Sequence, residues 1–262
     1  MSAPRRMLIA GNWKMNPTRA ADAHVLAQLI GAAVTLPVDV DVIVCPPTIY
    51  LDLVRGALIG SGVGVGAQTM HWEASGAYTG ETSPEMLSGD PGNRIATHVI
   101  IGHSERRQYD GETDEKVARK VAAAFAYGLI PIAAIGETLE ERQAGQAEAV
   151  VRRQLTAAIS EVDTLGGRRM AIAYEPVWAI GTGMAASGAD AQAAAGVIRE
   201  LLVAAFGSDG SAIPILYGGS VTGENAAEFF ERDDVDGALV GGASLKPDAF
   251  AAIVTAAGAS AS

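Results

Sequence analysis

Four side chains in the sequence have the chemistry to move a proton beside a carbonyl group: Asn12, Lys14, His103 and Glu175. A carboxylate such as Glu175 can act as the base. A histidine, an amide and a cation can stabilise the negative charge that then develops on oxygen. Because these groups suffice without a covalent nucleophile, the set favours the isomerisation of a small carbonyl compound.

Each of these residues also has an ordinary interpretation. Lys14 can be a surface lysine, and His103 can be a structural residue that caps the helix expected after it. At a helix N-terminus the helix dipole disfavours protonation, so His103 would be a neutral hydrogen-bond donor. Glu175, which precedes a proline, is a weak signal when taken alone.

The segment 177–183 after Glu175 is apolar and contains Trp178, Ile180 and two glycines. Exposed loops seldom carry large apolar side chains, so we interpret this segment as a lid that excludes water from Glu175. A loop permanently docked on the protein is the alternative.

Two pairs of glycines indicate a phosphate site. They stand at 218–219 and 241–242, each directly after a short apolar run. Glycines let backbone N–H groups come close to phosphate oxygens, a common arrangement in the last two loops of a barrel. The alternative is that the glycines are needed only for tight turns, which would explain either pair alone but not both so readily.

The elements that must position these residues are short apolar runs rich in Val and Ile. They lack in-out alternation, which is typical of parallel strands buried on both faces. The eight expected strands are Met7–Ala10, Val40–Val44, Val63–Ala67, His98–Ile101, Ile130–Ile135, Met170–Tyr174, Ile213–Tyr217 and Gly237–Val240. Apolar spacing predicts helices between them at Ala20–Val34, Thr113–Tyr127, Gln146–Val162 and Ala189–Phe206.

Eight strand-helix units in 262 residues predict one closed (β/α)₈ barrel, a single α/β domain over residues 1–262. An open doubly wound sheet is the alternative, but its Gly-x-Gly-x-x-Gly turn is absent after the first strand. In a barrel the carboxyl ends of the strands converge, so the candidate residues would meet there.

Composition narrows the possible partners and location. The net charge of −11, with no basic block, argues against binding to nucleic acid or to an anionic membrane surface. No apolar run reaches the roughly 18 residues of a membrane span. The single cysteine, Cys45, fits a reducing compartment and predicts a cytoplasmic protein. We expect no metal, because His24, His71 and His98 lack metal-ligand spacing, and we also expect no cofactor.

Along nearly its whole length the sequence resembles the triosephosphate isomerase family. The segments that carry the resemblance are Ala10–Asn16, Gly102–Arg107, Ala173–Gly183, Tyr217–Val221 and Leu239–Lys246. The resemblance implies an aldose-ketose isomerase that interconverts dihydroxyacetone phosphate and D-glyceraldehyde 3-phosphate through an enediolate, in glycolysis and gluconeogenesis.

The resemblance also implies residue roles. Glu175 would be the catalytic base, His103 the neutral electrophile, and Asn12 and Lys14 the contacts of the substrate oxygens. Glu105 would pair with Lys14 inside the site, although a surface ion pair is the alternative. The backbone amides that would bind phosphate are those of Gly181, Ser220, Gly241 and Gly242.

The segment Gln68–Thr82 is longer than barrel loops need to be. The resemblance makes it a dimer arm that inserts into a second copy of the chain. Thr79 would then brace Asn12 and Lys14 across a two-fold interface, which predicts a homodimer with poor activity when dissociated.

Three positions depart from the family pattern. Met184 stands where a lysine or arginine is usual, which puts the timing of lid closure in doubt. Ala134 replaces a usual cysteine, and Thr69 replaces a usual asparagine. We expect a shifted rate or stability and an unchanged reaction.

Two other functions remain open from the sequence. One is an isomerase of a four-carbon sugar phosphate, because barrels change substrate through their loops. The other is a non-catalytic barrel that binds phosphorylated metabolites. Glu175 speaks against the second, since a carboxylate repels a bound anion unless a proton moves.

Overall fold

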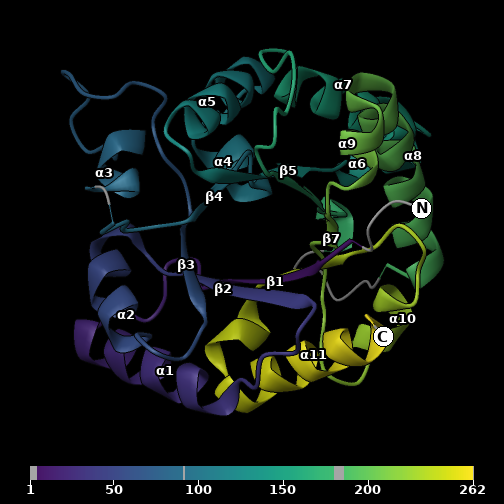
Figure 1. Cartoon of the computed structure of the whole chain (residues 1–262). Coiled ribbons are helices and arrows are strands. Elements are labelled where there is room, and N and C mark those ends of the chain that lie inside the picture. Colours follow the sequence, from purple (N-terminus) through teal and green to yellow (C-terminus); the bar gives the residue numbers. More distant parts are fainter. Residues whose placement is uncertain (1–4, 91, 180–185, 262) are drawn as a thin grey trace.

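A ring of parallel strands forms the centre of the structure, a computed structural model that describes residues 5–90, 92–179 and 186–261 (Figure 1). The strands are β1 (Met7–Asn12), β2 (Val40–Cys45), β3 (Gly64–Ala67), β4 (His98–Ile101), β5 (Ile130–Ile135), β6 (Ala171–Tyr174), β7 (Ile215–Tyr217) and β8 (Gly237–Val240). Each pairs in parallel with the next, and β8 pairs with β1 to close the barrel. The predicted fold class is confirmed.

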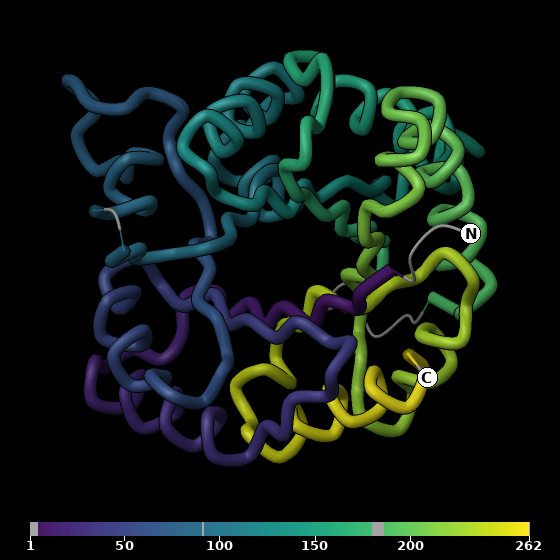
Figure 2. Tube along the Cα trace, in the orientation of Figure 1, coloured from purple at the N-terminus to yellow at the C-terminus, as the bar shows by residue number. Residues whose placement is uncertain are grey.

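Helices surround this ring, as the chain trace in Figure 2 shows. The longer ones are α1 (Ala20–Ala33), α5 (Asp114–Ala126), α7 (Ala147–Ala158), α8 (Gly188–Phe206) and α11 (Pro247–Ser260). The shorter ones are α2 (Leu51–Ala57), α3 (Pro84–Ser88), α4 (Ser104–Tyr109), α6 (Leu139–Gln143), α9 (Ser208–Ser211) and α10 (Ala226–Phe230). Single 3₁₀ turns are η1 (Thr48–Tyr50), η2 (Val177–Ala179) and η3 (Gly242–Leu245).

Side chains on the two faces of each strand enter different cores. In β1, Leu8 and Ala10 belong to the small cluster inside the barrel, whereas Ile9 belongs to the larger cluster under the helices. Burial on both faces explains why the strands read as continuous apolar runs. The departure at Ala134 lies inside the barrel and is fully buried.

Hydroxyl side chains set where two of the predicted helices begin. The Thr113 hydroxyl accepts a hydrogen bond from Lys116 N–H, and Ser187 forms a reciprocal capping box with Asp190. Such caps satisfy backbone donors that the first helical turn leaves free. The four helices predicted from the sequence are found with ends shifted by a few residues at most.

The segment from Gln68 to Thr82 contains neither helix nor strand and loops away from the barrel, toward the upper left of Figure 2. Its ends are tied by a hydrogen bond of 2.8 Å from His71 N–H to Thr82 O. The His71 ring stacks on Trp72 and also contacts Tyr78. The segment therefore has internal packing of its own.

None of the helices within the described ranges is long and apolar enough to cross a membrane.

The amino-terminal end of the barrel interior is polar. His98 precedes the inward-facing Ile100 by two residues and is 6% exposed. Asp41, at the start of β2, accepts hydrogen bonds from Arg6 at 2.8 Å and from Arg169 at 2.7 Å. Burial, assisted by the charge of Arg169, lowers the pKa of His98 to about 4.

This buried histidine predicts an acid-sensitive fold. Between about pH 6.5 and pH 4 the unfolded chain binds a proton at His98 that the folded chain does not, so the free energy of unfolding falls as pH falls through that window. When the pH is lowered from 7 to 5, we expect the free energy of unfolding of His98→Phe to fall by about 2 kcal/mol less than that of the parent protein. Urea unfolding at the two pH values tests this, and equal losses in both proteins would contradict it.

Candidate active site

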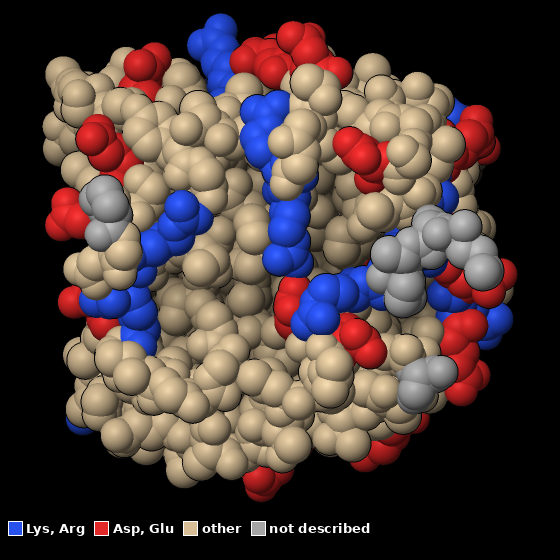
Figure 3. Space-filling model, viewed as in Figure 1, with Lys and Arg blue, Asp and Glu red and all other residues tan. Residues whose placement is uncertain are grey.

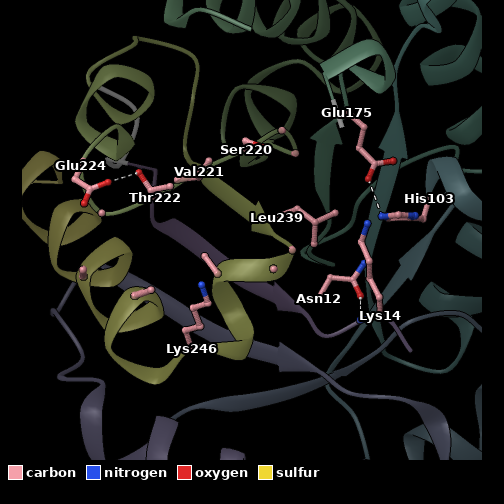
Figure 4. A pocket seen from close by; sticks show the side chains of 18 residues that line it. Asn12, Lys14, His103, Glu175, Ser220, Val221, Thr222, Glu224, Leu239 and Lys246 are labelled. Atoms are coloured by element: carbon pink, nitrogen blue, oxygen red, sulfur yellow. Dashed lines mark hydrogen bonds and ion pairs between the residues drawn. The ribbon is translucent and has the colours of Figure 1, made fainter. Parts of the chain in front are cut away.

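Side chains from the carboxyl ends of several strands share one cavity of about 710 Å³. Asn12 ends β1, His103 follows β4 and Glu175 follows β6, so parallel strands bring all three to the same end of the barrel. Figure 4 shows these side chains and Lys14 gathered on one side of the cavity. The first group of residues predicted from the sequence is therefore brought together.

Glu175 is held by two hydrogen bonds inside this cavity. Its Oε1 lies 2.9 Å from His103 Nε2, and its Oε2 accepts the Ser104 backbone N–H at 2.8 Å. The residue is only 2% exposed. Gly218 lies against it, where an added Cβ would approach Glu175 Cγ to 2.8 Å. The carboxylate is thus shielded from water and has a fixed position.

His103 is the N-cap of α4, as the sequence predicts. Its Nδ1 accepts the Glu105 backbone N–H at 3.2 Å, so the ring proton of the neutral imidazole lies on Nε2, facing Glu175. Burial lowers the pKa of His103, but the neighbouring carboxylate of Glu175 outweighs burial and raises it above the ordinary value. The sequence predicts only the effect of the helix terminus and misses the direct contact with Glu175.

Lys14 projects its ammonium group toward the same side of the cavity. Its Nζ lies 2.5 Å from Glu105 Oε1, an ion pair between partly exposed side chains. Lys14 adopts a φ of +50°, unusual for a residue with a Cβ. Its backbone N–H donates to Asn12 Oδ1 at 2.9 Å, which holds the turn. The pairing with Glu105 that the resemblance implies is present in the structure.

Gln68, at the end of β3, supports this turn across the end of β2, a role that the sequence analysis missed. Its side-chain amide donates to Lys14 O at 2.7 Å and to Cys45 O at 2.8 Å. Gln68 directly follows β3, so its position at a strand end is the one signal in the sequence that points to it.

The opposite wall of the cavity is largely backbone. Gly218, Gly219 and Ser220 line it from the end of β7, and Gly241 and Gly242 line it from the end of β8. A Cβ added at Gly242 would meet no atom within 4 Å, so its backbone is open to the cavity. The remaining candidate for this wall, Gly181, lies outside the described residues, as does Met184.

Further along the cavity lie residues that the sequence analysis did not assign to the site, among them Lys246, Thr222 and Glu224 (Figure 4). Glu224 Oε2 accepts a hydrogen bond from the Thr222 hydroxyl at 3.3 Å. Together with Lys14, Lys246 places cationic side chains on this cavity within an acidic protein.

A buried ionic network lies beneath His103, and nothing in the sequence singled it out. Glu112 Oε1 accepts the Gly102 backbone N–H at 2.8 Å, and its Oε2 contacts Lys120 Nζ at 2.9 Å and Arg106 Nε at 2.7 Å. Burial raises the pKa of Glu112, but these cations, Lys120 first, outweigh it and lower the pKa. Lys120 Nζ also donates to the hydroxyl of Thr69, one of the departures.

The described start of the predicted lid is anchored in the protein. Trp178 is buried within η2, and its indole N–H donates to Glu137 Oε1 at 2.8 Å. Glu137 is fully buried and also accepts from the Tyr174 hydroxyl and from Arg142. Burial is the main cause that raises the pKa of Tyr174, whose hydroxyl therefore stays protonated and remains a hydrogen-bond donor.

Within the described ranges, no three His, Cys, Asp or Glu side chains are grouped as metal ligands.

Comparison with known proteins agrees with this geometry. The family model described as triosephosphate isomerase matches residues 7–257. The chain is 50% identical over 251 residues to the triosephosphate isomerase of Carboxydothermus hydrogenoformans, covering 95% of this chain and 98% of the relative. It is 49% identical over 254 residues to that of Symbiobacterium thermophilum, covering 97% of both chains. By these matches, and with the barrel and cavity just described, the chain belongs to the triosephosphate isomerase family.

Proposed function

We propose that Glu175 is the base that moves a proton in the reaction of this family, the interconversion of dihydroxyacetone phosphate and D-glyceraldehyde 3-phosphate. The observation that carries the proposal is the position of its carboxylate, 2% exposed and 2.9 Å from His103 in a cavity that Lys14 also lines. A shielded carboxylate beside hydrogen-bond donors suits removal of a proton next to a carbonyl.

His103 and Lys14 stabilise the enediolate oxygen in this proposal. The Nε2–H of His103 now donates to Glu175, and the substrate oxygen takes over this hydrogen bond when substrate enters. Glu175 is thereby released to accept the proton. Lys14 and Asn12 supply positive charge and an amide donor next to the same oxygen, where they act most strongly as its charge develops.

The phosphate group lies against the glycine wall. Ser220, Gly241 and Gly242 contribute backbone N–H groups, and the absence of side chains at the two glycines lets the phosphate oxygens approach. The family resemblance adds Gly181 to this proposal as a further backbone contact of the phosphate. The reaction transfers a proton within one molecule, so it needs no cofactor, and it serves glycolysis and gluconeogenesis alike.

The substrate is tested by turnover assays of the purified protein with D-glyceraldehyde 3-phosphate and, separately, with a four-carbon ketose phosphate. We expect the triose phosphate to be turned over much faster. A faster reaction with the four-carbon compound would keep the base and the barrel but overturn the proposed substrate.

We further propose a cytoplasmic location. Cys45 is a fully buried free thiol, and burial raises its pKa to about 12, so it is protected from oxidation but gains no disulfide. Such a chain needs no oxidising compartment to fold.

The homodimer is part of the same proposal. Met15, which follows β1, is 89% exposed, and Ile49, in η1 after β2, is 81% exposed. Tyr78, in the segment 68–82, is also half-exposed. In the dimer, the segment 68–82 of a second copy would cover Met15 and Ile49 with apolar side chains such as Tyr78. Thr79 of that segment would brace Asn12 and Lys14.

We expect Ile49→Asp to dissociate the dimer, because an unpaired charge is costly to bury in an apolar interface. Activity should fall by at least about tenfold, since each site loses the brace on Lys14, and tenfold corresponds to only 1.4 kcal/mol. Sedimentation velocity and turnover at the same concentration test this. Ile59→Asp, at a position 80% exposed, is the control. A parent protein that is monomeric and fully active would reject the dimer.

A further inference from the structure

A second cavity, of about 320 Å³, opens at the other end of the barrel, where the strands begin. Arg5 and Arg6 precede β1, Asp41 and His98 stand at the starts of β2 and β4, and Arg168 and Arg169 precede β6. Figure 3 views the molecule from this end and shows Lys and Arg side chains running down the middle of the face, beside a hollow. The catalytic cavity lies at the opposite end.

Cations outnumber carboxylates in the lining of this cavity. Four arginines line it against two acidic residues, Asp41 and Asp209, although the chain as a whole carries a net charge of −11. Asp41 is shared between Arg6 and Arg169. Arg5 pairs with Asp236, and Arg6 also lies 3.7 Å from Asp39, so the positive charge left for an anionic ligand is that of Arg168 and, in part, Arg169.

Arg168 has the least neutralised of these guanidinium groups. It donates to the backbone carbonyls of Leu165 and Thr164 and lies 4.7 Å from the centre of the Phe125 ring. In the part of the chain that the structure describes, it pairs with no carboxylate. A guanidinium held by carbonyls and a ring keeps its full charge for a ligand.

His98 lines the same cavity and contributes an unused acceptor. The Thr97 hydroxyl donates to Val65 O at 3.1 Å, so at its 2.8 Å contact with His98 Nδ1 it must accept, and Nδ1 carries the proton. Nε2 is then a bare acceptor. It is buried and has no hydrogen-bond partner among the described residues. Such an atom calls for a donor, because an unsatisfied buried polar group is costly.

The rest of the lining is apolar and includes Leu8, Ile130 and Met170. A fully hydrated inorganic ion would gain little from these side chains, whereas a carbon skeleton would bury against them. Arg169 is 58% exposed on its side chain, so its guanidinium is accessible to an anion that enters from solvent.

We propose that this cavity binds a small organic anion that carries both acidic groups and a hydroxyl group. The acidic groups bind Arg168 and Arg169, the hydroxyl donates to His98 Nε2, and the carbon skeleton packs on the apolar wall. His103 stands five positions after His98, at the other end of β4, and five extended residues span up to about 16 Å, so the bound anion lies far from the reacting carbonyl. This site is independent of the catalytic one.

The test compares two tricarboxylates that differ by one hydroxyl, citrate and propane-1,2,3-tricarboxylate. The catalytic cavity is first saturated with 2-phosphoglycolate, which we expect to bind there through its phosphate group, so that citrate cannot act at that site. The four histidines give few imidazole signals in NMR, and His98→Phe identifies the signal of His98. We expect citrate to shift this signal at millimolar concentration and to bind about tenfold more tightly than the compound without the hydroxyl.

Arg169→Gln should weaken citrate binding by about tenfold, since it removes a charged hydrogen-bond donor from an exposed position. Arg153→Gln is the matched control, an equally exposed arginine that does not line this cavity. Calorimetry of the same samples gives the affinities. The inference is overturned if neither anion moves the His98 signal at about 10 mM, or if both arginine variants bind citrate alike. Equal affinity for the two anions would overturn the role of His98 Nε2.

Discussion

Glu175→Gln should lower kcat by about 10²–10⁴-fold while leaving the protein folded, because an amide of the same shape cannot accept the proton. The amide oxygen can still accept the Ser104 N–H, so one of the two hydrogen bonds that hold this side chain is retained. Binding of 2-phosphoglycolate should change far less than turnover, since the glycine wall and Lys14 remain. Steady-state kinetics and calorimetry together separate the two effects.

Glu224→Gln is the matched control for this substitution. Glu224 lines the same cavity, but its carboxylate bonds to Thr222 and not to His103. We expect its kcat to stay within about threefold of the parent, because the substitution removes no group that touches the reacting atoms. Equal losses of turnover and ligand binding in Glu175→Gln would undermine its assignment as base and favour a barrel that only binds phosphorylated metabolites.

Lys14→Met should lower kcat/KM by at least about 10²-fold, the usual cost of removing a preorganised group that faces developing negative charge. Methionine keeps an unbranched side chain that reaches as far as the lysine Cε but removes the ammonium that lies 2.5 Å from Glu105. The substitution also leaves Glu105 unpaired beside the cavity, which adds repulsion toward an anionic substrate. Circular dichroism and thermal unfolding would confirm that the variant folds.

Lys246→Met is the control that separates contact with the reacting oxygen from general attraction of the substrate by a positive charge. Lys246 also lines the cavity, but among the residues of η3 and α11, away from Glu175 and His103 (Figure 4). A cation at that distance attracts substrate without touching the reacting oxygen, so we expect a loss of kcat/KM of tenfold at most and a dependence on ionic strength. Equal losses in the two variants would show that Lys14 acts only through general attraction.

The strand ends explain how much of the site the sequence could predict. Buried parallel strands can be predicted from the sequence because burial on both faces requires apolar residues at nearly every position. The barrel then places the carboxyl ends of all the strands on one side. Asn12, His103 and Glu175 all stand at such ends, so their convergence follows from topology alone. Ser220, Gly241 and Gly242 follow in the same way.

The supporting residues were harder to foresee. Glu112 directly precedes the expected helix Thr113–Tyr127, and Lys120 lies within it. Charged residues at such positions are usually exposed to solvent. They are buried because each is the counter-ion of the other, a relation between positions that periodicity cannot show. Gln68 was missed since one amide at the end of a short strand gives little signal by itself.

The contact between Glu175 and His103 could not be predicted for a different reason. Both were expected to face a substrate oxygen or carbon, and the sequence does not say what they contact when that substrate is absent. A carboxylate buried to 2% exposure must find donors, and the nearest are His103 Nε2–H and Ser104 N–H. The same need fixes the base in place before substrate binds.

The central claim is that the reaction proceeds by proton transfer through Glu175, and isomerisation in D₂O tests it most directly. Product formed from D-glyceraldehyde 3-phosphate is examined by proton NMR for deuterium on the carbon beside the carbonyl. A carboxylate that holds the proton can exchange it with solvent, so we predict deuterium in the product and its near disappearance in Glu175→Gln. Complete retention of the substrate hydrogen, or undiminished incorporation in the variant, would contradict the claim.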